Sequence, residues 1–487
     1  MLPLLLLSGS VLLVVLASFF LAGMILRQGV TPDYPWLLAT GEWILDYHRL
    51  PATDLFSWTA AERGWIVYQW AFEIVLASIH RLAGHETVAT LIAWSALAIY
   101  LIVPLHTAPR RTPALLIAAI GAAVLAVVSV NLSLRPMIAT SAGLLVQHLL
   151  IYRMRAGRTS LLGGVLWIFP LYAAWANLHT GFALGIGSLL LILAGDWTEL
   201  RRDVEPGSKH WSTPLHPSQV GALLLAATLG TLITPYGPQL HTYLALLSTE
   251  AALNARIDEL GSPDFGMFQF QLLLGLVLLL VAAMTRQSGA LRPADLLQLA
   301  ALILATFFAA RFVVWSALYL VLLLPTVVAR AWPALSRHCM ASSRRPLILI
   351  LTLAAISAPP LLASRGFADP VGHLCARLTP AIEAYAAQRL PQDRLLTDPI
   401  SGSCMIAAAP GIPVFIDTRF DFYGGAFSTA TLDALALKSG WRTLIEGYRI
   451  DVAVLDRRRP LAEALTIDSQ FTILFRDSEA VVVRRLH

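Results

Sequence analysis

Acidic side chains stand out in the segment that follows the first long apolar run of the chain. This segment, TPDYPWLLATGEWILDYHRLPATDLFSWT, extends from Thr31 to Thr59 and contains Asp33 and Asp54. Two carboxylates in one loop beside an apolar run suit general-base or metal-assisted chemistry on a lipid-borne substrate. The structural alternative is capping: Pro35 predicts the first turn of a helix that starts just after Asp33, and Asp54 can cap a turn.

The helix predicted after Asp33 runs to about Tyr47. Four of its residues share one face by spacing: Trp36, Thr40, Trp43 and Tyr47. Aromatic side chains on one face suit a helix that lies in the headgroup layer of a membrane. We therefore expect Asp33 next to the bilayer surface.

Isolated cations interrupt apolar sequence further along the chain. Arg135 ends the string NLSLRP, His179 lies in the turn WANLHTGF, and Arg311 breaks ILATFFAARFVVW. An arginine so close to lipid is costly without an anionic partner, and a phosphate is one such partner because guanidinium binds it bidentately. The alternatives are a protein carboxylate for Arg311, snorkelling for Arg135 and a structural hydrogen bond for His179. Tyr236, in a Pro-Tyr-Gly turn, opens the next loop.

A second polar cluster lies near the C-terminus. The string PVFIDTRFDFYGG places Asp417, Arg419, Asp421 and Tyr423 directly after a strand-like run. Loops at strand ends often carry function, and salt bridges among these neighbours are the alternative. The sequence has no Walker A motif, no GxGxxG after a strand, no zinc-ligand spacing and no GxSxG, which argues against nucleotide-driven chemistry.

The composition predicts the scaffold that must position these residues. The 487-residue chain is 57% hydrophobic and only 13% charged, whereas soluble proteins carry about 25% charged residues. Its apolar runs are near 20 residues long, which predicts a polytopic α-helical membrane protein rather than a barrel. We place eleven spans, at about 3–26, 86–105, 114–131, 137–152, 161–177, 181–196, 218–234, 267–284, 294–310, 312–329 and 347–364.

The orientation follows from the basic residues. If the apolar but polar-studded segment 66–83 lies in the outer interface without crossing, the arginine-rich loops all fall on one side, which the positive-inside rule assigns to the cytoplasm. The first apolar run of the chain is then a retained membrane span. The formal charge of +5 is explained by the basic loops of this topology and does not indicate nucleic-acid binding. This orientation makes 27–85 and 235–266 external loops of a membrane domain, 1–365.

The remainder, 366–487, is also external in this orientation. Its turns and charges separate short β-type runs from helical ones, which predicts a small α/β domain. Cys375 and Cys404 both fall in it. In an oxidising compartment they could pair as a disulfide, and two buried small hydrophobes are the other possibility.

This arrangement resembles the GT-C superfamily of integral-membrane glycosyltransferases that use polyprenyl-phosphate-linked sugars. The strings that carry the resemblance are TGEWIL, LPATDLFSWT, QWAFE, WANLHTGF, TPYG, SPDF and PVFIDTRFDFYGG. The resemblance extends over most of the chain. The sequence departs from the pattern at Leu37, where a histidine is expected after Trp36.

The resemblance implies an inverting glycosyltransferase at the periplasmic face of a bacterial inner membrane. It implies that Asp33 is the base, that Asp54 and Glu73 are second-line acids, and that Arg135, His179, Tyr236 and Arg311 are candidates for binding donor and phosphate. Asp417 and Arg419 would close the site. A divalent cation, Mg²⁺ or Mn²⁺, stays open, with Asp33 and Asp54 as ligands. The acceptor would be a glycan, a lipid or a protein.

Three alternatives remain from the sequence alone. A lipid-linked glycan ligase or polymerase also has many spans and an external active site, but depends more on Arg and His. A transporter or flippase predicts ionisable residues near the bilayer midplane and inverted repeats, neither of which the sequence shows. A non-catalytic scaffold would use its external domain to bind partners.

Overall fold

The chain divides into two compact units, each described here by itself. The computed structural model describes residues 19, 20, 23, 26, 31–109, 112–129, 131, 133, 135–201, 213–249, 258–287, 289–334, 344–363, 372–438 and 440–486. Unit 1 comprises Met1–Gly29, Glu86–Pro238 and Glu259–Ala368, and unit 2 comprises Val30–His85, Gln239–Asp258 and Asp369–His487.

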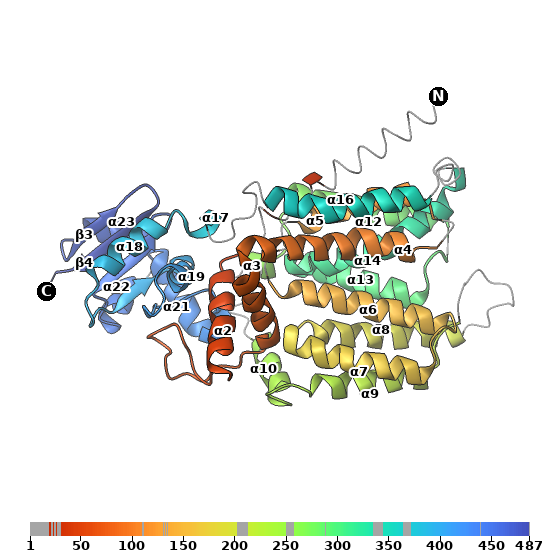
Figure 1. Ribbon diagram of the computed structural model, residues 1–487, viewed down its shortest axis with the longest axis horizontal. Helices are drawn as coiled ribbons and strands as arrows, with labels where there is room; N and C mark the ends of the chain where they lie inside the picture. The colour runs from red at the N-terminus through yellow and green to blue at the C-terminus, as the bar shows by residue number, and fades with distance from the viewer. Residues whose placement is uncertain are drawn as a thin grey trace, which may run out of the picture. The chain divides into compact units, whose positions relative to one another are not determined.

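Unit 1 is a bundle of apolar helices that run side by side (Figure 1). Helices that are not consecutive in the chain pack together, as α7 does with α9 and α8 with α13. Its helices are α4 (Val103–Thr107), α5 (Ala114–Val128), α6 (Met137–Arg155), α7 (Leu161–Leu178), α8 (Phe182–Arg201), α9 (Pro217–Thr231), α12 (Phe268–Arg286), α13 (Pro293–Phe308), α14 (Val313–Ala331) and α16 (Arg344–Leu362), with a π-helical turn at Ala98–Ile102 and 3₁₀ turns at Asp258–Leu260 and Ala310–Phe312.

The predicted spans between 114 and 329 are confirmed as helices, and each begins within one residue of its predicted start. Among the described residues, five helices are long and apolar enough to cross a membrane. The predicted first span lies almost entirely outside the described residues. The hydrophobic pattern predicts helix starts well because Pro or a polar residue precedes most of them.

Helix α3 (Trp70–Leu97) begins in unit 2 and continues into unit 1. Gly84 interrupts it with φ 76° and ψ 176°, a conformation that glycine adopts without the strain that a side chain would bring. The break falls between the predicted interfacial segment 66–83 and the predicted span that starts at 86. Placement of 66–83 in the outer interface stays a prediction.

Unit 2 combines the first loop of the chain with the C-terminal residues. Helix α2 (Tyr34–Tyr47) packs against α19 (Pro399–Ala408), and Ser57 forms a parallel β-bridge with Val414. The short helix α10 (Gln239–Ser248) also belongs to this unit. Segments separated by more than 300 residues therefore build one structure.

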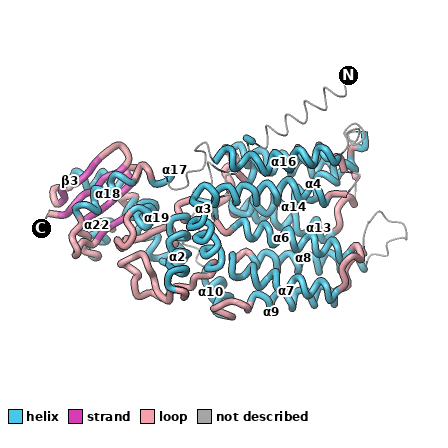
Figure 2. The backbone as a smooth tube through the Cα atoms, in the orientation of Figure 1, coloured by secondary structure: helices cyan, strands magenta, loops and turns pink. Residues whose placement is uncertain are grey.

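The C-terminal part is an α/β domain, as predicted, and its strands are magenta in Figure 2. They form a four-stranded sheet in the order β1-β2-β4-β3. Only β1 and β2 are parallel, with Leu395 opposite Val452. Its elements are α17 (Gly372–Cys375), α18 (Thr379–Gln388), β1 (Leu395–Thr397), α19, α20 (Phe420–Tyr423), α21 (Gly425–Leu435), α22 (Trp441–Gly447), β2 (Val452–Asp456), α23 (Pro460–Ile467), β3 (Phe471–Arg476) and β4 (Ala480–Arg485).

A disulfide joins Cys375 and Cys404 in the core of this domain. Of the two possibilities left open for these cysteines, the structure has the covalent pair. The disulfide ties the short helix α17 to α19, the helix against which α2 packs.

One expectation for α2 is wrong. Trp36 and Thr40 do not face a headgroup layer, because both are buried inside unit 2. The Thr40 hydroxyl donates to the Trp36 carbonyl, and Trp43 and Tyr47 are the more exposed members of the predicted face. The four residues share a spacing, but the long-range contacts of unit 2 divide them.

Candidate active site

Asp33 lies at the N-terminus of α2 and is half-buried, but its side chain makes no capping hydrogen bond. The Thr418 hydroxyl instead donates to Asp33 Oδ1 over 2.6 Å, and Trp36 Nε1 lies 3.4 Å from the same oxygen. Trp36 Nε1 also donates to Thr418 Oγ1 over 3.1 Å. The capping interpretation of Asp33 therefore fails.

A second carboxylate, Asp421, comes close enough to Asp33 for their charges to interact. The hydroxyls of Tyr68 and Tyr243 donate to Asp421 Oδ2 over 3.0 and 3.3 Å. Burial and the negative charge of Asp33 raise the pKa of Asp421, while the hydrogen bond from Tyr68 opposes them. Two neighbouring carboxyl groups in different environments can divide the ionised and the protonated role between them.

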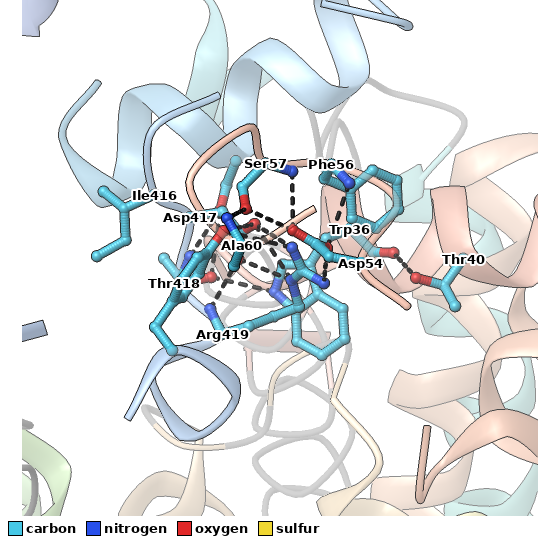
Figure 3. A network of polar contacts seen from close by, with 12 residues as sticks. Trp36, Thr40, Asp54, Phe56, Ser57, Ala60, Ile416, Asp417, Thr418 and Arg419 are labelled. Atoms are coloured by element: carbon cyan, nitrogen blue, oxygen red, sulfur yellow. Dashed lines mark hydrogen bonds and ion pairs between the residues drawn. The ribbon is translucent and has the colours of Figure 1, made fainter. Parts of the chain in front are cut away.

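Asp54 is enclosed in a buried polar network around Arg419 (Figure 3). Arg419 Nη1 lies 2.7 Å from Asp54 Oδ1, and Arg419 Nη2 lies 2.6 Å from Asp417 Oδ2. The Ser57 amide and hydroxyl both donate to Asp54 Oδ2, so Asp54 caps a turn as one of its two interpretations predicts. All three charged side chains are at most 1% exposed.

Aromatic rings surround the same guanidinium. Its carbon atom lies 4.6 Å from the ring centre of Trp65 and 4.9 Å from those of Phe56 and Phe422. The Tyr423 hydroxyl donates to Asp417 Oδ2 over 2.9 Å. The salt bridge predicted as the alternative for this loop is therefore present, and it joins the first loop of the chain to residues just after the Val414 bridge.

Glu73, near the start of α3, is completely buried. Neither of its carboxylate oxygens has a hydrogen-bond partner among the described residues. It lines a cavity of about 10 Å³ together with Tyr68, Arg419 and Asp421, which is about the volume that a single water molecule needs. Glu73 thus lies behind the site rather than on its surface.

The two carboxylates suggested as metal ligands do not fit a shared cation. Both oxygens of Asp54 are already occupied, by Arg419 and by Ser57. Among the described residues, no group of three or more His, Cys, Asp or Glu side chains is arranged to hold a metal ion.

Unit 1 contains the predicted cations. Arg135 pairs with Glu259, its Nη1 lying 2.9 and 2.8 Å from the two carboxylate oxygens. Tyr236 is half-buried in the turn after α9. Arg311, half-buried in the 3₁₀ turn Ala310–Phe312, makes no ion pair with a carboxylate among the described residues, so the alternative of a protein partner finds no support there.

His179 lies immediately after α7 and is buried. Its Nδ1 accepts the Gly181 amide proton over 3.2 Å and lies 2.6 Å from Thr140 Oγ1. Burial and the positive charge of Arg311 lower the pKa of His179 to about 3. Since an amide can only donate, Nδ1 is the acceptor and the neutral ring carries its proton on Nε2.

Three residues that contact Asp33 or Asp421 are not predicted as site residues by the sequence: Tyr68, Tyr243 and Thr418. Asp421 belongs to the polar string PVFIDTRFDFYGG, but the string does not indicate which residues Asp421 contacts. Thr418 stands between Asp417 and Arg419, which attracted attention by their charge. The tyrosines come from separate loops that only the fold brings to Asp421.

No protein-family model matches the sequence, and no curated protein matches it. Solved structures do. ArnT from Cupriavidus metallidurans, bound to undecaprenyl phosphate, is 14% identical and has a TM-score of 0.53, with 98% of each chain covered. The same protein in the apo state has a TM-score of 0.51 at 12% identity.

A second neighbour is the archaeal oligosaccharyltransferase AglB from Archaeoglobus fulgidus, solved in complex with an inhibitory peptide and a dolichol-phosphate. It is 13% identical and has a TM-score of 0.53 over 92% of this chain and 69% of AglB. At these identities the likeness shows a shared fold.

Proposed function

We propose that this chain, whose fold is that of the GT-C integral membrane glycosyltransferases, transfers a sugar from a polyprenyl-phosphate donor to an acceptor hydroxyl. The observation that carries the proposal is the likeness over 98% of both chains to a protein bound to undecaprenyl phosphate. The reaction takes place at the periplasmic face of a bacterial inner membrane. The disulfide in unit 2 supports that side, because disulfides persist in oxidising compartments.

Asp33 is the general base of this mechanism. It takes the proton of the acceptor hydroxyl while the oxygen attacks the anomeric carbon, and the bond from that carbon to the phosphate oxygen breaks on the opposite face, which inverts the configuration. Thr418 and Trp36 hold the carboxylate through Oδ1. A positioned base contributes about 10²- to 10⁴-fold to the rate.

The leaving polyprenyl phosphate carries away the bonding electron pair and needs positive or donor groups. Arg311 is suited to it, since its guanidinium has no carboxylate ion pair among the described residues and binds phosphate bidentately. The neutral His179 donates from Nε2. Arg135, by contrast, is occupied by Glu259, and a donor-binding role for Arg135 and Tyr236 stays a prediction.

We expect that Asp54, Asp417 and Arg419 position the loop that bears Thr418. They do not contact substrate in this mechanism. All three are enclosed and mutually paired. Their removal should therefore affect stability first and turnover second.

The test is transfer by purified protein in proteoliposomes that contain the lipid extract of a strain lacking the gene. Wild-type protein should consume a lipid-linked sugar that accumulates in that strain, and Asp33→Asn should slow the transfer at least 100-fold with normal folding. Asp433→Asn, which removes a surface carboxylate paired with Lys438, is the matched control. Arg311→Gln should raise the KM for the donor. Retained transfer by Asp33→Asn would overturn the role of Asp33, and uptake without a covalent product would favour the transporter alternative.

A further inference from the structure

Unit 2 contains a cleft along α2, here named the α2 cleft. It is lined by α2 between Tyr34 and Tyr47, by His80 and His85 near the Gly84 break, and by residues 406–413 at the end of α19. Its volume is about 560 Å³, within the range of about 300–1,000 Å³ typical of ligand sites. None of the residues placed in the mechanism above lines it.

The cleft starts next to Asp33 in the chain. Tyr34 and Pro35 line one end, and the lining residues recur along one side of α2 as far as Asp46 and Tyr47. With a rise of 1.5 Å per residue, the eleven steps from Pro35 to Asp46 span about 16 Å. A ligand in the cleft would thus extend along α2 away from the residue proposed as base.

One side of the cleft is polar. Glu42 Oε1 lies 3.1 Å from His80 Nδ1, and the Tyr34 hydroxyl lies 2.6 Å from His85 Nδ1. Asp46 pairs with Arg81 over 2.7 Å and is largely exposed. These groups offer carboxylate oxygens and ring nitrogens as hydrogen-bond acceptors and donors.

The opposite side is apolar, with Ile406, Pro410, Ile412 and Pro413 among its members. Two aromatic rings complete the cleft: Trp43 and Tyr47 lie 4.7 Å apart between centroids, inclined by 30°. The Tyr47 residue is 59% exposed. An accessible aromatic pair in a cleft offers flat apolar surface at a low cost in side-chain entropy.

This combination fits a carbohydrate better than other ligands. The apolar C–H face of a sugar ring packs on aromatic or aliphatic surface, while its hydroxyl edge donates to carboxylates. A phosphate-bearing ligand would have to compete with Asp46 for Arg81, and a lipid chain would leave the polar side without partners once water is displaced.

We infer that the α2 cleft binds a neutral oligosaccharide, the acceptor of the transfer reaction. The inference rests on the proposed function and names its acceptor class. The aromatic pair at the far end holds the outer residues of the oligosaccharide and thereby directs one hydroxyl toward the Asp33 end of α2.

The first experiment measures binding without any donor. Labelled full-length protein in detergent is applied to a microarray of bacterial cell-surface oligosaccharides, and the soluble form of the best-retained oligosaccharide is then titrated by calorimetry. Trp43→Ala and Asp46→Asn should each weaken its binding at least tenfold. Trp441→Ala and Glu446→Gln, two half-buried or exposed positions of α22 outside the cleft, are the matched controls and should bind as wild type.

The outcomes separate the two proposals. If no oligosaccharide is retained, or if Asp46→Asn and a folded Trp43→Ala bind as tightly as wild type, the cleft is not an acceptor site. If transfer to another acceptor proceeds nonetheless, the proposed function stands without the inference. If the oligosaccharide binds through the cleft but no lipid-linked sugar is ever transferred to it, the binding site stands and the glycosyltransferase proposal fails.

Discussion

At the scale of single residues, Arg419 connects the first loop of the chain to the C-terminal residues of unit 2. It binds Asp54 and Asp417 and lies against three aromatic rings at 4.6 to 4.9 Å. A buried guanidinium is stable only because its partners are equally buried and correctly oriented. The three charges depend on each other, so removing one leaves the others uncompensated.

We therefore predict that Arg419→Met destabilises the protein by about 3–5 kcal/mol, the usual cost of breaking a buried ion pair. Arg419→Lys should recover only part of this, since an ammonium cannot make the same planar, forked contacts. Thermal unfolding in detergent measures both. Lys438→Met is the control, because Lys438 and its partner Asp433 are 52% and 28% exposed, and its loss should cost no more than about 1 kcal/mol. Equal shifts for Arg419→Met and Lys438→Met would contradict the prediction.

Asp421 should make stability depend on pH in a defined direction. Its pKa in the folded protein is raised, so the folded state binds its proton more tightly than the unfolded chain does. Wild-type stability then falls as pH rises from the ordinary Asp pKa, about 3.9, through the raised value. Asp421→Asn has no titrating carboxyl at this position, and its side-chain oxygen can still accept the hydrogen bond from Tyr68. The difference in Tm, variant minus wild type, should increase with pH across that window, and a flat difference would show that the carboxyl titrates normally.

At the scale of secondary-structure elements, a glycine sets the distance between α2 and α3. A Cβ atom on Gly41 would lie 2.0 Å from the Glu73 carbonyl oxygen and 2.9 Å from the Ala77 Cβ atom. The backbone of α3 cannot yield there without moving the helix. This close contact fixes α2, and with it Asp33 at the helix start.

Gly41→Ala tests the contact, because two effects oppose each other. Alanine favours a helix over glycine by about 1 kcal/mol, whereas overpacking costs about 1–3 kcal/mol. With backbone as the obstacle we expect the clash to dominate, so Tm falls and Asp33-dependent transfer falls with it. Gly447→Ala in α22, where a Cβ atom meets nothing within 4 Å, should leave Tm unchanged or raise it. A stabilised Gly41→Ala protein would mean that α2 packs less closely than described.

Sequence alone predicts the elements better than their meeting points. The helix starts in unit 1 can be predicted from apolar periodicity and from a proline or polar residue at the start of a helix, because both are local features of the sequence. The encounter of Asp33 with Thr418 joins residues 385 positions apart, and nothing in either local string encodes it. For the same reason Trp36 was assigned to a membrane face although it donates to Thr418. The charges of Asp54 and Arg419 mark both residues in the sequence, but their ion pair depends on the fold, in which Ser57 also forms a β-bridge with Val414.

At the scale of the whole molecule, the chain is organised as two units built from interleaved segments. Unit 2 takes its residues from three separate stretches, so its folding must close long loops before the contacts around Arg419 form. The Cys375–Cys404 disulfide acts within this unit. It holds α19 in place, and α19 packs against α2 and ends at one side of the α2 cleft.

Loss of the disulfide should therefore weaken unit 2 selectively. The bond closes a loop of 29 residues, for which chain entropy gives a stabilisation of about 3–4 kcal/mol. The double variant Cys375→Ser/Cys404→Ser should lower Tm and speed proteolytic cleavage within 372–486, while peptides from the helices of unit 1 stay protected. Cys339→Ser, which removes the third cysteine, controls for thiol chemistry as such and should leave the cleavage pattern as in wild type. If the double variant exposed both units equally, the two would unfold as one cooperative structure and the selective role of the disulfide would be refuted, because stability lost at α19 would then be shared by the whole chain.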